Sequence, residues 1–128
     1  MFGKKDVMAL DMKLKRAMSN EMFLESTMIA ASILDENVNN ALTAVGDRMV
    51  AYPLDGKVRK LNMYYNSKNE YVMQNFDRNT LNQLQLWTEK KERLMQSLPR
   101  TEYDSDSFRT IATEGNALVD YFKSKKFN

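Results

Sequence analysis

The sequence predicts a mainly α-helical bundle, and three observations support this fold class. Glycine and proline are scarce, with four and two copies among 128 residues. Methionine, which forms helices readily, occurs ten times. Apolar residues also recur at alternating steps of three and four from Val7 to Met49, the spacing of a helix that packs on another helix. We therefore expect one helical domain over residues 1–128, with a long N-terminal helical region at 4–52, a variable middle segment at 53–79 and a C-terminal helix pair at 80–126.

The repeat of apolar residues from Val7 to Met49, which we call the heptad stripe, sets the expected architecture. Only two of its positions are polar, Glu21 and Asp35. A single helix over this region would be roughly 65–70 Å long, whereas a compact chain of this size has a radius of gyration of only about 14 Å. We therefore expect the helix to break. Asn37–Asn40 is the favoured place because asparagine prefers turns and caps, and Gly46 is a second candidate. An unbroken helix, which would need a partner, is the alternative.

The stripe is wider than a simple coiled coil requires. Additional apolar residues lie beside it, namely Met8, Met18, Met22, Ile29 and Ile33. A face of this width is typical of a helix that contacts two neighbours in a bundle.

The middle segment fits two structures. Pro53 ends the N-terminal region because the residue before a proline avoids the helical conformation, and Leu54–Lys57 is predicted to be a turn at its Asp-Gly pair. Between residues 57 and 76 the apolar and aromatic residues fall roughly at helical spacing, so a helix is the preferred prediction. Two β-prone runs around the polar Asn66–Asn69 keep a short β-hairpin around residues 57–76 as the alternative.

Two further helices are predicted near the C-terminus. Residues 80–98 form one, because Thr80 and Gln83 match a capping box and Pro99 stops the helix. Residues 105–125 form the other, with a cap and an acidic first turn supplied by Asp104, Ser105 and Asp106. Gly115 should cost this last helix about 1 kcal/mol relative to alanine, unless a neighbouring helix needs the room.

Composition argues against catalysis. The chain has neither cysteine nor histidine, so thiolate nucleophiles, the commonest general base and the commonest metal ligand are all missing. Glu21 and Glu25 lie one helical turn apart, as carboxylates do in di-metal bundles, but the histidines of those sites are absent. We therefore predict a protein that is not an enzyme, with no cofactor, no metal and no evident small-molecule substrate.

Charge is unevenly distributed along the chain. Residues 17–47 contain no lysine or arginine, although the net charge is +2. A basic and aromatic segment follows, and its combination of cations and rings is typical of single-stranded nucleic-acid binding. The residues that would carry this alternative function are Lys57, Arg59, Lys60, Tyr64 and Tyr65.

The preferred function is a structural or protein-interaction role. We expect the heptad stripe to bind a second copy of the chain, giving a homo-oligomer, or another protein. The partner-binding residues would be Leu10, Leu14, Leu24, Met28, Val38 and Leu42. No apolar run has the ~20 residues of a membrane span, so we expect a cytoplasmic location. By association only, a small chain rich in methionine and asparagine suggests an accessory or virion component of a phage or other mobile element.

Overall fold

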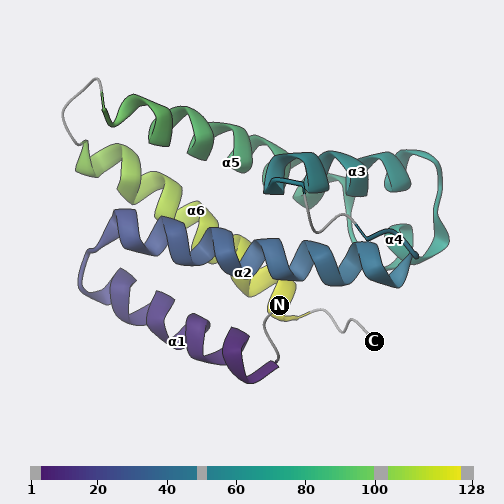
Figure 1. Ribbon diagram of the computed structural model, residues 1–128, viewed down its shortest axis with the longest axis horizontal. Coiled ribbons are helices and arrows are strands. Elements are labelled where there is room, and N and C mark those ends of the chain that lie inside the picture. The colour runs from purple at the N-terminus through teal and green to yellow at the C-terminus, as the bar shows by residue number, and fades with distance from the viewer. Residues whose placement is uncertain (1–3, 49–51, 100–103, 125–128) are drawn as a thin grey trace.

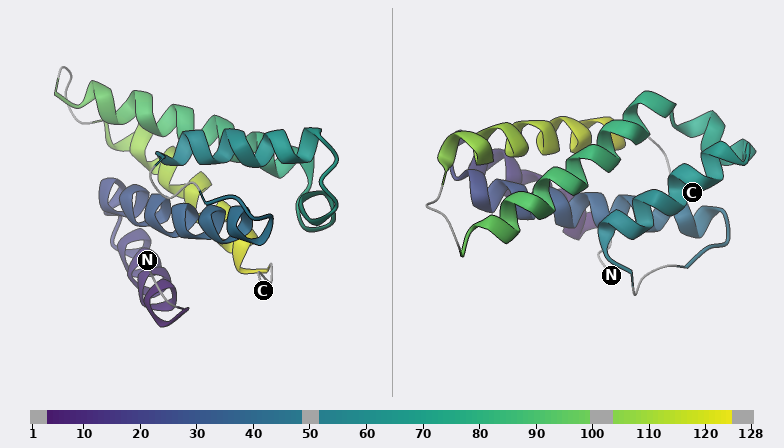
Figure 2. Two further views of the ribbon diagram at one scale, coloured as in Figure 1. Left: turned by 45° about the vertical axis from the view of Figure 1, so that its right-hand side comes forward. Right: turned by 90° about the horizontal axis from the view of Figure 1, so that it is seen from above.

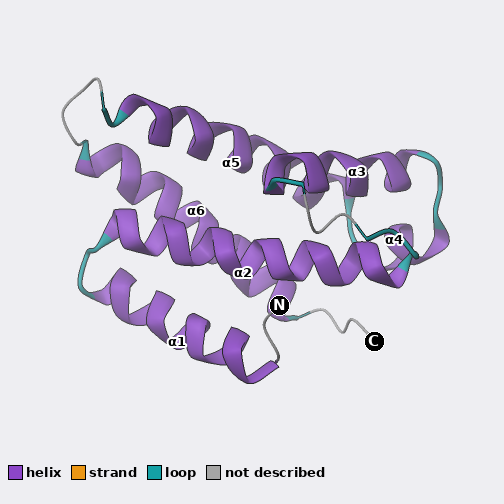
Figure 3. Ribbon diagram, in the orientation of Figure 1, coloured by secondary structure: helices purple, strands orange, loops and turns teal. Residues whose placement is uncertain are grey.

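Six α-helices and no strands make up the described part of the chain (Figure 3). The computed structural model describes residues 4–48, 52–99 and 104–124. The helices are α1 (Lys4–Ser19), α2 (Phe23–Ala44), α3 (Leu54–Asn66), α4 (Glu70–Asn75), α5 (Arg78–Ser97) and α6 (Ser105–Lys123). The predicted helical class is therefore confirmed.

Helix α2 is the centre of the arrangement. It contacts α1, α3 and α6, while α5 packs on α3 and α6, and α1 lies at the outer edge of the molecule (Figures 1 and 2). The main core forms where α2, α3, α5 and α6 meet. Its fully buried side chains include Leu34, Val38, Leu42, Val58, Leu61, Leu81, Leu84, Trp87 and Val119.

The predicted break at Asn37–Asn40 is wrong, and so is the unbroken N-terminal helix. Asn37–Asn40 lies inside α2, whose neighbouring Val38, Ala41 and Leu42 are fully buried. Burial of these side chains outweighs the preference of asparagine for turns. Helix α2 ends near the second candidate, Gly46, which has a φ of 82°. The other break lies between α1 and α2, in a turn that contains neither glycine nor proline.

The alternative β-hairpin around residues 57–76 is also wrong, and the preferred helical prediction is confirmed. Helices α3 and α4 cover this segment, and Ser67, Lys68 and Asn69 form the turn between them. The predicted turn at Leu54–Lys57 is instead the first turn of α3, which begins directly after Pro53. Proline suits this position because the first amide groups of a helix need no internal partner.

The two C-terminal helices follow the prediction closely. Helix α5 begins two residues before the predicted Thr80, because the Asp77 carboxylate accepts a hydrogen bond from the Thr80 amide. Asp104 caps α6 as expected, accepting hydrogen bonds from the amides of Asp106 and Ser107. The Ser107 hydroxyl, which also donates to the Asp104 carboxylate, and these two amide bonds hold the pKa of Asp104 below its ordinary value.

Gly115 lies where α6 comes closest to its neighbours. A Cβ atom at this position would lie 2.8 Å from Cζ2 of Trp87 and 3.2 Å from Cβ of Ala30. The Trp87 ring is fixed there, since its Nε1 donates a 2.8 Å hydrogen bond to the carbonyl of Ile111. A neighbouring helix does need the room, and glycine at this point permits α2, α5 and α6 to meet.

Candidate functional site

The predicted partner-binding residues do not form one surface. Leu14, Val38 and Leu42 are fully buried in the core, and Leu10 and Leu24 are partly buried. Met28 is 55% exposed. Most of the heptad stripe is therefore used within the chain, and partner binding through it stays a prediction.

The turn between α1 and α2 explains why Met28 faces outwards. Over the first half of α2, the buried residues that lie one position before a stripe residue are Phe23, Thr27, Ala30 and Leu34. In the second half, Val38 and Leu42 of the stripe are themselves buried. One position turns a helix by about 100°. The inward face of α2 is thus offset from the stripe near the turn, which leaves Met28 on the surface.

An apolar hollow remains at the start of α2. It has a volume of about 340 Å³ and is lined by Met22, Phe23, Leu24, Glu25 and Met28; we call it the N-terminal hollow. Met22 and Met28 are 48% and 55% exposed. Phe23 packs with Phe108 and Ala112 of α6 in a small second core. Partly buried residues at the end of α5 pack against it, namely Leu94, Met95 and the cap residue Leu98.

Charged groups border this hollow. The Arg109 guanidinium lies 5.1 Å from the centre of the Phe23 ring and 3.4 Å from a carboxylate oxygen of Glu21. Glu25 is exposed and makes no ion pair with any described residue. The sequence pointed to Met22 as an apolar residue beside the stripe, but nothing in the sequence identified Phe23 or the contribution of Arg109.

The basic and aromatic segment forms α3 and is largely occupied by contacts within the chain. Lys57, whose side chain is 3% exposed, makes a 2.8 Å ion pair with Asp35 of α2. Arg59 pairs with Asp55 one turn earlier, and Lys60 lies 3.7 Å from Asp47. A buried, paired lysine cannot reach a phosphate without losing its partner.

The two tyrosines of this segment are engaged as well. Tyr64 donates a 2.8 Å hydrogen bond to Asp47, which raises the pKa of Tyr64 above its ordinary value. The ring of Tyr65 lies 4.8 Å from the guanidinium carbon of Arg78. Nucleic-acid binding therefore stays a prediction, and no arrangement of side chains on α3 favours it.

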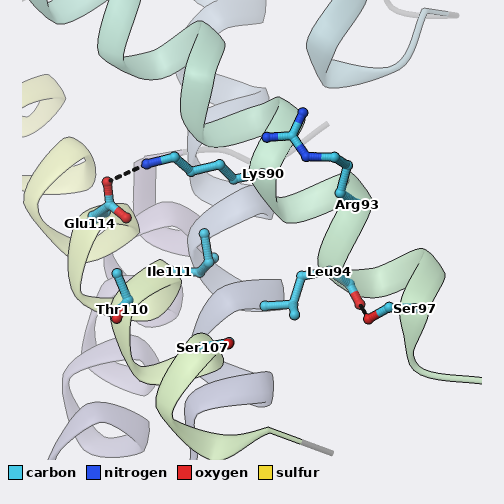
Figure 4. Close-up of a pocket in the computed structure, with 8 residues that line it drawn as sticks. All are labelled: Lys90, Arg93, Leu94, Ser97, Ser107, Thr110, Ile111 and Glu114. Carbon is cyan, nitrogen blue, oxygen red and sulfur yellow. Dashed lines mark hydrogen bonds and ion pairs between the residues drawn. The ribbon is translucent and has the colours of Figure 1, made fainter. Parts of the chain in front are cut away.

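A groove of about 450 Å³ runs between α5 and α6 (Figure 4). Lys90 reaches across it to within 3.6 Å of Glu114. The hydroxyl groups at its wall already donate hydrogen bonds, Ser97 to the carbonyl of Leu94 and Thr110 to that of Asp106. Ser107 donates to Asp104. The groove thus has cations, occupied hydroxyls and one carboxylate, Glu114, which faces Lys90 and accepts from none of these hydroxyls. An activated nucleophile would need such a base as its hydrogen-bond partner.

Acidic residues likewise offer no metal site in the described part of the chain. No three Asp or Glu side chains come together there as ligands. Glu21 lies in the turn before α2 and pairs with Arg109, while Glu25 lies on the surface of α2. Among the described helices, none is long and apolar enough to cross a membrane.

Comparison with known proteins adds no assignment. Neither a protein-family model, a curated protein nor a solved structure matches this chain. The case for function consequently depends on the geometry of the surfaces described above.

Proposed function

We propose that this protein is a non-enzymatic helical module that binds another protein chain through the N-terminal hollow. One observation carries the proposal: Met22 and Met28 are about half exposed beside an apolar cavity at the end of a well-packed bundle. Methionine is flexible and polarizable, so it adapts its shape to the apolar side chain of a partner. An accessory role in a phage or other mobile element would be one setting for such a module.

The charge around the hollow indicates the kind of partner. Glu21 at the edge of the hollow is paired with Arg109, but Glu25 is exposed and makes no ion pair with any described residue, which leaves a net negative charge beside the hollow. Opposite charges across an interface increase the association rate and favour the correct partner. The expected ligand is therefore an amphipathic helix with one or two large apolar anchors and basic residues beside them.

The absence of cysteine makes a site-directed cross-linking test direct. Met28→Cys introduces a single thiol, which can be labelled with a benzophenone maleimide and illuminated in an extract of the source cells. We expect discrete protein adducts, identified by mass spectrometry, and a second copy of the chain would be recognised among them. Adding Met22→Asp should remove these adducts, because a buried, unpaired carboxylate opposes docking.

Met63→Cys is the matched control. Met63 is 48% exposed on α3, so it tests whether any exposed methionine position gives the same adducts. Equal adducts from both positions, or adducts that persist with Met22→Asp, would count against the hollow as the binding site. Circular dichroism of each variant verifies that the helices are retained.

A further inference from the structure

The turn between α1 and α2 closes with an unusual residue. The Met22 amide donates to the carbonyl of Ala17 and the Glu21 amide to that of Met18, the two bonds of a Schellman motif. This motif needs a left-handed residue, normally glycine, and here Glu21 adopts it with a φ of 56°. A residue with a Cβ atom is strained in this conformation.

Little else in the turn prevents a continuous helix. No glycine or proline occurs between Lys4 and Ala44. Helix α2 also begins without a capping side chain at Met22, whereas Asn69, Asp77 and Asp104 cap α4, α5 and α6. The turn is three residues long, and short strained hinges of this kind favour exchange of segments between copies.

The contacts that hold α1 are all made with other helices. Leu14 and Ala17 are buried against the rest of the bundle. Asp11 pairs with Lys123 of α6 at 2.9 Å, and Lys15 with Asp120 at 2.8 Å. An α1 helix supplied by a second copy would make the same contacts, so the docking surface fits either source.

We propose that α1 is an exchangeable segment, and that two copies of this chain form a dimer by trading their α1 helices. In the exchanged dimer residues 20–22 become helical, joining α1 and α2 into one helix roughly 60 Å long at 1.5 Å per residue. Each α1 then occupies the surface of α2 and α6 in the other copy. Such exchange reuses the contacts of the monomer and needs no new interface, so its free-energy cost is low. The inference is argued from the turn and from the contacts of α1, not from the N-terminal hollow, although Met22 belongs to both.

Charge reversal distinguishes exchange from docking within one chain. The α1-reversed variant carries Asp11→Lys and Lys15→Asp, and the α6-reversed variant carries Asp120→Lys and Lys123→Asp. Like charges then face each other in either variant alone. If the two are unfolded together in urea and refolded, the exchanged heterodimer restores every pair. With one variant labelled with ¹⁵N, native mass spectrometry should show the heterodimer in clear excess over both homodimers.

Combining all four substitutions in one chain is the matched control, since it restores the pairs within a monomer and should behave as the original protein does. A statistical mixture of dimers, or monomers only, would overturn the proposal. So would a strictly monomeric original protein after refolding at high concentration, measured by light scattering.

Substitution in the turn gives a second, independent readout. Glu21→Gly relieves the left-handed strain in the closed form and disfavours the helical form, so the dimer should weaken by about tenfold or more. Lys68→Gly is the control, because Lys68 is left-handed (φ 64°) in the equivalent turn after α3. An equal effect of both substitutions, or none from Glu21→Gly, would contradict exchange at this hinge.

Discussion

Helices α1 and α6 both contact α2, yet they are held in different ways. Helix α6 is embedded, with its buried face formed by Phe108, Ile111, Ala112, Gly115, Leu118, Val119 and Phe122. Helix α1 lies at the edge of the bundle, where Leu14 and Ala17 are its buried side chains among residues 9–19. Its links to α6 are ion pairs near the surface. Apolar burial stabilises α6 along its length, whereas surface ion pairs add little stability to α1. Removing a contact of α6 should therefore destabilise the whole bundle, and removing a contact of α1 should release α1 alone.

Removing a large side chain from each helix should show the difference most clearly. Phe122→Ala empties a site in the main core, next to the ring of Phe76 at 5.7 Å, and should lower the free energy of unfolding by about 3–5 kcal/mol. Leu14→Ala should instead release α1 while the other helices stay folded. Hydrogen exchange measures both effects. Equal loss of protection in α5 and α6 from the two variants would show that α1 is as integral as α6.

A smaller change in the free energy of unfolding is expected at Gly115, where α6 comes closest to Trp87 of α5. Gly115→Ala brings a Cβ atom to 2.8 Å from the Trp87 ring, and we expect a loss of about 1–3 kcal/mol from overpacking. Gly56→Ala is the control in α3, since its Cβ would meet only Tyr52 at 3.8 Å. That variant should gain up to about 1 kcal/mol from helix propensity. Urea unfolding of both variants gives the comparison, and a gain from Gly115→Ala would refute the close contact.

The cap of α6 should contribute less than its buried face. Because the pKa of Asp104 is lowered in the folded protein, its stabilisation is complete above the ordinary aspartate pKa of about 4 and is lost as pH falls through the lower folded value. Asp104→Ala should therefore reduce Tm slightly at neutral pH, and less in strong acid. Asp104→Asn, which can cap but does not titrate, should show a weaker acid dependence than the original protein.

The smallest effect is expected from the ion pair that links α1 to α6. The hydrogen bond and charge of Asp11 raise the pKa of Lys123, so this contribution is complete below the ordinary lysine pKa of about 10.4 and is lost as pH rises through the folded value. Lys123→Gln should cost at most about 1 kcal/mol, less at high salt. The protection of the α1 amides, measured relative to their base-catalysed intrinsic exchange rate, should decrease in alkaline solution, and much less so in the variant.

Sequence patterns located several elements because their signals are local. The start of α6 is predictable from Asp104, whose side chain accepts hydrogen bonds from the nearby amides of Asp106 and Ser107. The end of α5 is predictable from Pro99, which lies two residues after Ser97, the last residue of that helix. The break at Glu21 was missed because the same backbone turn that Gly46 forms after α2 is here formed by a residue with no preference for it. Its trace in the sequence was a polar residue on an apolar stripe.

The sequence by itself determined that the chain is helical and lacks the commonest catalytic side chains, because both depend on residue type and spacing. Only the tertiary structure decided which side of each helix is buried. After the left-handed Glu21, the buried residues at the start of α2 lie one position before the stripe, which leaves Met28 exposed. Leu14 of α1 and Val38 farther along α2 are buried on the stripe itself. Pairing across helices likewise placed Lys57 inside the protein beside Asp35. Such outcomes depend on contacts between distant segments, and periodicity within one segment carries no information about them.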